Sequence, residues 1–206
     1  MYRMELIEAL RTTGAVRQFT DTPVADEVVA RVLDNARFAP SGANAQAWHV
    51  VLVKDPAIRR ALRDLYLPGW HDYLAMKAAG LRPWAPGNDP AAEADALASA
   101  PAELRAAATE GFAADFYRAP VLLAARAEGL GGVLTTMLIR EEESVRELLG
   151  APSGWALATV IALGHPVKQP RRLTRRTVPE FATIDRMDGT PLPGPPKSSE
   201  TEAQAT

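Results

Sequence analysis

The chain has 206 residues, a length that suits one globular domain or one domain with a tail. Apolar residues make up 47% of it, and 23 basic residues against 25 acidic ones give a formal net charge of -2. This composition argues against wholesale disorder and against nucleic-acid binding through bulk positive charge, and the lack of cysteine excludes disulfides and thiolate chemistry. No apolar run approaches the ~20 residues of a membrane span, and the N-terminus lacks a secretory pattern, so we expect a cytoplasmic protein without a membrane segment.

The first forty residues predict two helices joined by a turn. The first ends before Gly14, and the second presents one apolar face made of Val28, Val29, Val32, Leu33 and Ala36. Its first turn carries Asp26 and Glu27, where the helix dipole favours negative charge. Pro40-Ser41-Gly42 then ends this region.

Two apolar runs predict buried strands. One is the β-branched run 48–53, and the other is the nearly unbroken run 155–163, which is typical of a central strand covered on both faces. Between them, Asp55-Pro56 opens a predicted helix with Ile58, Leu62 and Leu65 on one side. A further helix is predicted over 141–149, closed by Gly150.

Residues 67–118 are less regular. Pro68-Gly69 and later Pro and Gly residues break up this stretch, which holds the aromatic residues Trp70, Tyr73, Trp84, Phe112, Phe116 and Tyr117. Two interpretations stay open: ordinary packing under a long excursion, or a lid over an apolar site, since long ordered loops are often functional.

The C-terminal part predicts a last strand or an extended arm over 181–187. From Thr190 onward the Pro-rich and polar composition is that of a disordered tail, so the sequence predicts a domain over 1–189 and a tail over 190–206.

Groups able to act as acids, bases or metal ligands are scarce. The three histidines, His49, His71 and His165, have no metal-ligand spacing, and structural roles are favoured for them. The glycine-rich stretch 129–132 lacks the dinucleotide-binding spacing. No metal site is predicted.

Two features stand above this background. The loop 39–48 combines small residues with a hydroxyl and two amides, which can offer both donors and acceptors to a flat polar ligand. Arginines also lie at both ends of the chain, and guanidinium groups bind phosphate through paired hydrogen bonds. They are Arg11, Arg17, Arg171, Arg172, Arg175 and Arg176.

In this order the segments resemble the FMN-dependent nitroreductase family. The resemblance is carried by Arg-Thr-Thr-Gly-Ala-Val-Arg-Gln-Phe at 11–19 and Ala-Pro-Ser-Gly-Ala-Asn-Ala-Gln-Ala-Trp at 39–48. It continues through 124–131, Leu-Gly-Ala-Pro-Ser-Gly-Trp at 149–155, Leu-Gly-His-Pro at 163–166 and the arginine pair 175–176. It covers roughly residues 4–66 and 118–188.

The resemblance implies an α+β fold, with a central and mostly antiparallel sheet flanked by helices. It also implies a homodimer that binds FMN at the subunit interface and reduces nitroaromatics, quinones or related small acceptors with NADH or NADPH. The flavin carries the chemistry, so no catalytic side chain is expected.

The same resemblance assigns the cofactor contacts. Arg17 would contact the FMN phosphate at the end of the stretch Thr13-Gly14-Ala15-Val16-Arg17, and Arg175 or Arg176 would close over it. Pro40, Ser41 and Asn44 would reach the flavin from the partner chain, with Gln46 near the ring. The backbone of Leu134, Thr135 and Thr136 would face the isoalloxazine.

The sequence departs from the family pattern in two places. Members often begin the phosphate site with Arg-Arg-Ser-x-Arg, of which Thr13-Gly14-Ala15-Val16-Arg17 keeps the last cation. Each lost charge-assisted hydrogen bond costs ~1.5–3 kcal/mol, so weaker FMN retention follows. An internal deletion near 123–124 also fuses the start of a strand to the end of a helix. The segment 121–128 therefore predicts one short helix followed by Gly129, and the sheet has one strand fewer.

These departures leave two alternatives beside the flavin oxidoreductase. One is a degenerate protein of the same fold that binds flavin weakly or not at all and acts as a binding or assembly module. The other is a flavin- or deazaflavin-handling protein with a different acceptor.

Overall fold

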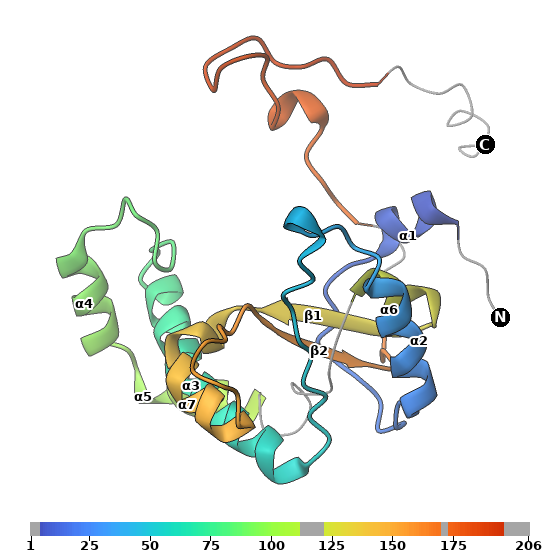
Figure 1. Ribbon diagram of the computed structural model, residues 1–206. Helices are drawn as coiled ribbons and strands as arrows, with labels where there is room; N and C mark the ends of the chain where they lie inside the picture. The colour runs from blue at the N-terminus through green and yellow to red at the C-terminus, as the bar shows by residue number, and fades with distance from the viewer. Residues whose placement is uncertain (1–4, 112–121, 170–172, 196–206) are drawn as a thin grey trace. The chain divides into compact units, whose positions relative to one another are not determined.

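The computed structural model describes residues 5–111, 122–169 and 173–195 (Figure 1). The chain divides into two compact units, residues 1–171 and 172–206, which are described separately below. In the described part of the chain, no helix is long and apolar enough to cross a membrane. The larger unit combines helices with a small antiparallel sheet, so the predicted α+β class is confirmed.

The two predicted N-terminal helices are present as α1 (Leu6–Thr12) and α2 (Asp26–Ala36). The apolar face of α2 buries Val32 against Ala125, Leu130 and Leu163. Asp26 and Glu27 occupy its first turn, as the sequence predicts.

A short helix, α6 (Leu122–Ala127), lies beside α2 (Figure 1). Arg31 of α2 pairs with Glu128, just after α6, at 2.9 Å. Gly129 follows with φ +76°, a left-handed conformation that glycine adopts without steric cost. The prediction of one short helix ahead of Gly129 is confirmed over the described residues, and residue 121 lies outside them.

The sheet consists of two antiparallel strands, β1 (Gly131–Thr135) and β2 (Val160–Gly164), among the described residues. Their register runs from Gly131 opposite Gly164 to Thr135 opposite Val160. The segment 15–20 runs along the Gly131–Gly164 end, where the Val16 amide donates to the Gly132 carbonyl at 2.9 Å and the Thr20 amide donates to the His165 carbonyl at 2.8 Å.

This close approach explains two glycines. A Cβ on Gly131 would lie 2.6 Å from Val16 Cγ2, and one on Gly164 would lie 3.0 Å from Phe19 Cδ1. Both distances are shorter than ordinary carbon contacts, so the segment can pack here because these positions lack side chains.

The other half of the unit is helical. It contains α3 (Pro56–Ala78), α4 (Pro90–Ala98), α5 (Ala102–Gly111), η2 (Met137–Glu141) and α7 (Glu142–Leu149). In Figure 1, α3 and α7 lie side by side at the Thr135 end of β1. Their core contains Leu62, Tyr66, Leu138 and Val145. The predicted helix over 141–149 and its Gly150 cap, with φ +64°, are confirmed.

The predicted helix after Asp55 begins at Pro56, and the Asp55 side chain caps it by accepting from the Ala57 amide at 2.7 Å. The expected break at Pro68-Gly69 is wrong, because α3 continues to Ala78. Core packing on both sides of Pro68 outweighs the hydrogen bond that proline removes. Gly69 has a packing role, since a Cβ there would lie 3.0 Å from Met137 Sδ. The aromatic residues of 112–118 lie outside the described residues, so the lid interpretation stays a prediction.

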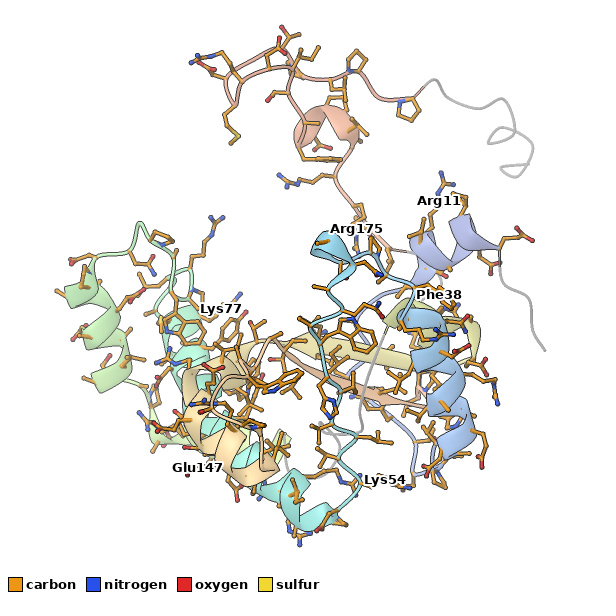
Figure 2. All side chains as sticks on the ribbon, in the orientation of Figure 1. Arg11, Phe38, Lys54, Lys77, Glu147 and Arg175 are labelled. Carbon is orange, nitrogen blue, oxygen red and sulfur yellow. The ribbon has the colours of Figure 1, made fainter. Side chains whose placement is uncertain are left out.

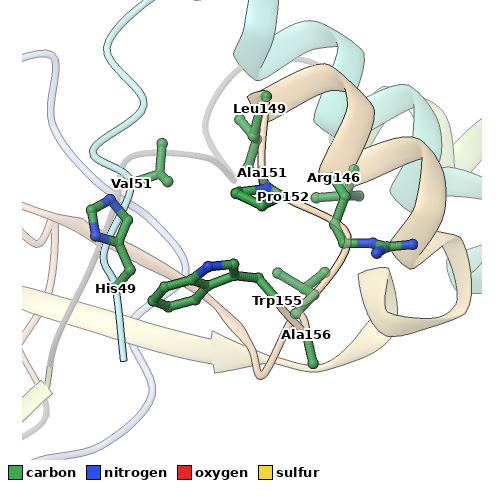
Figure 3. A pocket seen from close by; sticks show the side chains of 11 residues that line it. His49, Val51, Arg146, Leu149, Ala151, Pro152, Trp155 and Ala156 are labelled. Carbon is green, nitrogen blue, oxygen red and sulfur yellow. The ribbon is translucent and has the colours of Figure 1, made fainter. Parts of the chain in front are cut away.

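The predicted buried strand over 48–53 is wrong. This segment has no regular secondary structure, and Trp48, Val50 and Val51 keep 49%, 39% and 46% of their surface exposed. His49, Val51 and Trp155 line one cavity of about 340 Å³ (Figure 3). A strand needs a hydrogen-bonded neighbour, and no described residue pairs with the segment 48–53.

The other predicted strand, over 155–163, forms only in part. Regular pairing begins at Val160 and extends to Gly164, while Trp155 keeps 42% of its surface exposed. The first half of the run borders the same cavity and lacks a pairing neighbour among the described residues.

The second unit contains η3 (Val178–Glu180), where the Thr177 amide donates to the Glu180 carboxylate at 2.6 Å. Residues 181–187 form no regular strand. The Leu192 amide donates to the Ala182 carbonyl at 2.9 Å, so the chain folds back on itself past Thr190, where the predicted tail starts. Residues 196–206 of that tail lie outside the described residues.

Candidate functional site

The sequence-predicted cofactor residues fall into four groups in the chain. The structure pairs the segment 13–17 with β1 at Gly132, two residues before Leu134, where the second group begins. The loop 40–46 forms a separate group, and Arg175 with Arg176 belongs to the other compact unit.

The segment 13–17 runs from the end of α1 to the edge of β1. The Thr13 hydroxyl donates to the Ala9 carbonyl at 2.7 Å, and Ala15 bridges Gly132. Val16 is buried with 4% exposure, whereas Ala15 and Arg17 are exposed. Alternation along an extended segment therefore places Arg17 on the solvent side. Arg17 has neither an ion pair nor a hydrogen-bond partner in the part of the chain that the structure describes.

The end of β1 is the second part of this site. Leu134 keeps 49% of its surface exposed, which is unusual for a leucine in a strand that starts with three buried residues. The Thr135 hydroxyl accepts from the Met137 amide at 3.3 Å, and the Thr135 carbonyl accepts from the Thr159 hydroxyl at 2.9 Å. Thr136, where the strand passes into η2, is exposed.

Tyr66 of α3, which sequence reasoning missed, packs in the core with Leu138 of η2 and Val145 of α7. Only 3% of its surface is exposed. Burial raises the pKa of its hydroxyl, while Thr135 and the positive charge of Arg17 act to lower it. Its sequence signal is only a tyrosine four residues after Leu62 on an apolar helix face, which is more typical of core packing.

The loop 40–46 is exposed along most of its length and is shaped by its own hydrogen bonds. The Gln46 amide donates to Ser41 Oγ at 3.1 Å, and Gln46 Nε2 donates to Asn44 Oδ1 at 3.2 Å. Ala43, Asn44 and Gln46 adopt φ values of 50°, 53° and 48°. Such a conformation costs about 1 kcal/mol or more for each non-glycine residue, and an observed cluster of this kind is a reason to expect function. Within the described chain, the loop makes no hydrogen bond to β1 or to segment 13–17.

The arginines predicted to bind phosphate lie in different parts of the structure. Arg11 lies at the end of α1, where its side chain extends away from the helix (Figure 2). Arg175 and Arg176 are exposed in the second unit, and Arg175 Nη1 donates to the Thr174 carbonyl at 2.9 Å. Their closure over a phosphate stays a prediction.

The histidines occupy structural positions. The ring of His49 meets the ring of Trp155 edge-on at 5.7 Å, at one wall of the cavity in Figure 3. A ring nitrogen of His71 lies 3.2 Å from Thr109 Oγ1. Over residues 5–111, 122–169 and 173–195, no group of three or more His, Asp or Glu side chains could hold a metal ion.

Comparison with known proteins adds the identity of the fold. A sequence profile of the nitroreductase family matches residues 10–165. A protein named NADH dehydrogenase from Thermus thermophilus is 31% identical over 173 residues, which cover 75% of this chain and 83% of that protein.

Two solved structures share the fold. One is NADPH:FMN oxidoreductase from Vibrio harveyi in complex with NAD+, with a TM-score of 0.55 and 24% identity over 85% of this chain and 74% of the other. The second is oxidised iodotyrosine deiodinase bound to FMN and 3-iodo-L-tyrosine, with a TM-score of 0.57 and 22% identity over 84% of this chain and 96% of the other. Together with the sequence match, these similarities support an oxidoreductase. The chain belongs to the nitroreductase family.

Proposed function

We propose that this chain is an FMN-dependent NAD(P)H oxidoreductase of nitroreductase type. Its substrate is a nitroaromatic, a quinone or a similar small electron acceptor, and it works as a homodimer. The observation that carries the proposal is the pairing of segment 13–17 with β1 at Gly132, which places the exposed Arg17 beside the strand that leads to the exposed Leu134.

The residues present fit FMN by their chemistry. Phosphate needs a cation with free donors, which Arg17 offers from the solvent side of segment 13–17. The planar ring needs an apolar surface beside hydrogen-bonding groups, which Leu134, Thr135 and Thr136 combine over three consecutive residues. Bound FMN would supply hydride transfer from a nicotinamide to the acceptor.

The protein's own groups bind, orient and shield. Arg17 would hold the phosphate end, assisted by the backbone of Thr13, Gly14 and Ala15, and closure by Arg175 or Arg176 stays part of the proposal. Leu134 would exclude water from the ring, so fewer solvent molecules would compete with hydride transfer. No side chain of this set is required to exchange a proton.

The loop 40–46 supports the homodimer. Pro40, Ser41, Asn44 and Gln46 belong to a preorganised and mostly exposed loop whose hydrogen bonds to described residues stay within 41–48. Its amides are suited to a ring that carries carbonyls and an N–H. Because no hydrogen bond among the described residues joins the loop to β1 of its own chain, we assign it to the flavin bound across the interface, on the partner's β1.

The relatives support the cofactor and leave the acceptor open. The name of the Vibrio harveyi protein includes NADPH and FMN, and the deiodinase structure contains FMN with an iodinated amino acid. One fold therefore accommodates different acceptors, which keeps a flavin-handling protein with another acceptor as a candidate.

A binding or assembly protein of the same fold is the second candidate. It is favoured by the two-stranded sheet and by the half-exposed, unpaired segment 48–53. The loss of cations at Thr13 and Gly14 points the same way, because the phosphate site is weakened.

One experiment separates these candidates. The purified protein is titrated with FMN while flavin absorbance and fluorescence are recorded, and then assayed for NADH and NADPH oxidation with a quinone and a nitroarene. We expect saturable flavin binding and turnover. Protein that stays colourless after FMN is added would overturn the proposal, and binding without turnover would favour the second candidate.

A further inference from the structure

We propose that Arg126 is a second phosphate-binding residue of the flavin site, and that it makes the site select FMN over riboflavin. Its guanidinium reaches from α6 to the end of α1 and supplies a positive charge that Thr13 and Gly14 do not. This inference rests on the proposed function. It adds a residue from α6, an element to which the family resemblance assigns no flavin contact.

Arg126 lies at the start of the segment that carries Arg17. It belongs to the last turn of α6, a helix that contacts both α1 and β1 (Figure 1). Its Nη2 lies 3.5 Å from Oγ1 of Thr12, the last residue of α1. Segment 13–17 continues directly from Thr12 and pairs with β1 at Gly132. The guanidinium of Arg126 is therefore next to the backbone that is predicted to bind phosphate.

Arg126 is a half-buried cation that lacks an anion in the described part of the chain. Its Nε is buried and has no hydrogen-bond partner there, and no described carboxylate forms an ion pair with it. Its bond to Thr12 is long, and the Thr12 hydroxyl itself donates to the Glu8 carbonyl at 2.8 Å. Because a buried positive charge is costly until an anion satisfies it, this environment favours a bound anion.

The backbone after Thr12 offers donors to the same anion. The amides of Gly14 and Ala15 form no hydrogen bond with another described residue. Phosphate is bound by several N–H groups directed at it, and a guanidinium adds paired donors together with charge. Arg126 therefore offers from α6 the charge that the pattern Arg-Arg-Ser-x-Arg offers at the positions of Thr13 and Gly14.

A structural role for Arg126 is the alternative that a test has to exclude. The residue lies beside the C-terminal ends of α1 and α6, where the helix dipole favours a positive charge. Such a role would affect the binding of every flavin equally. FMN and riboflavin share their ring and ribityl chain and differ in the phosphate, so a phosphate contact affects FMN alone.

The test replaces Arg126 by methionine, which keeps an unbranched apolar side chain and removes the charge. Arg60→Met is the matched control, because Arg60 is an exposed arginine of α3 and its loss changes the net charge equally. Affinities for FMN and for riboflavin are measured by flavin fluorescence. The unfolding midpoint in urea is measured without flavin.

We expect Arg126→Met to weaken FMN binding by roughly 10-fold to 150-fold, the value of one charge-assisted hydrogen bond. Riboflavin affinity should stay at its wild-type value. The unfolding midpoint without flavin should not fall, because the charge that is removed has no anion in the unliganded chain. Arg60→Met should leave all three measurements unchanged.

Thr13→Arg tests whether the charge can be supplied from the other side of the site. This substitution returns an arginine to the first position of the family pattern. Combined with Arg126→Met, it should recover part of the lost FMN affinity and leave riboflavin affinity unchanged, because both arginines serve the same phosphate. Equal gains for FMN and riboflavin would contradict a shared phosphate contact.

The outcomes separate the inference from the proposed function. If Arg126→Met leaves the ratio of FMN to riboflavin affinity unchanged while the wild type binds and uses FMN, the inference is overturned and the function stands. If Arg126→Met does not fold, Arg126→Gln replaces it, since glutamine keeps a donor for Thr12 Oγ1; its affinity ratio should fall, and a wild-type ratio overturns the inference. Wild-type protein that takes up no FMN overturns both.

Discussion

Replacing Gly131 by alanine tests the contact that places segment 13–17 on the sheet. The added Cβ would lie 2.6 Å from Cγ2, 2.9 Å from Cβ and 3.2 Å from Cγ1 of Val16. Val16 is buried, and side-chain rotation leaves its Cβ 2.9 Å from the added atom, so relief needs a backbone shift that strains the bond from the Val16 amide to the Gly132 carbonyl. The segment carrying Arg17 must therefore move off the strand.

The expected cost is that of overpacking a buried contact, about 1–3 kcal/mol, with the lost backbone hydrogen bond adding about 1 kcal/mol. With a urea dependence of about 2 kcal/mol per molar, a loss near 2 kcal/mol lowers the unfolding midpoint by about 1 M. The assay is urea unfolding followed by circular dichroism, and FMN affinity is measured alongside.

Two variants make this prediction sharp. Gly87→Ala is the control, since a Cβ there meets no atom within 4 Å, and its midpoint should stay within ~0.3 M of wild type. Adding Val16→Ala to Gly131→Ala removes both Cγ atoms and should recover part of the loss. A Gly131→Ala midpoint equal to that of the control would refute the packing of segment 13–17 against β1.

Three further predictions follow from the site and its surroundings. Arg17→Ala should weaken FMN binding by roughly 10-fold to 150-fold, the value of a charge-assisted hydrogen bond. The unfolding midpoint should change little because the Arg17 side chain is exposed. An equal loss of FMN affinity in Arg11→Ala would contradict a specific phosphate contact of Arg17. Arg31 lowers the pKa of Glu128 through their hydrogen bond, so the pair stabilises the fold above the ordinary glutamate pKa. This contribution is lost as the pH falls through the lowered pKa. Glu128→Gln should therefore reduce the acid dependence of the free energy of unfolding measured across that pH range. Amides of 49–53 should exchange faster than those of β1 in native-state hydrogen exchange, because they lack backbone partners in the described chain, and strong protection there would contradict the unpaired segment.

The sequence predicted helices far better than strands. The starts of α2 and α3 follow from acidic residues in a first turn and from Asp55 before Pro56, and Gly129 and Gly150 mark two helix ends by local conformation. Such signals act within one or two turns of the chain. The run 48–53 has the composition of a strand, yet pairing depends on a neighbour far along the chain, which local pattern does not report. The predicted break at Pro68 was wrong for the same reason, because the residues that pack around this part of α3 come from η2 and α7, far along the chain.

The sequence predicted those candidate-site residues that lie in recognisable motifs, such as Arg17 and the loop 40–46. It did not predict the left-handed conformations of Ala43, Asn44 and Gln46, because these positions are not glycine. Tyr66 carries no motif, so only the fold shows that it is buried against Leu138 and Val145.

The end of β1 is held by contacts that do not involve segment 48–53. That unpaired segment lies beside the cavity lined by His49 and Trp155. Thr135 is held by the Met137 amide and by the Thr159 hydroxyl. The missing pairing at 48–53 in the described chain therefore leaves the groups that fix the end of β1 in place. FMN should therefore protect residues 133–137 from hydrogen exchange and leave 49–53 of the same chain unprotected. If 49–53 also become protected, repeating the exchange at dilutions that would dissociate the proposed homodimer tests whether a partner chain covers them.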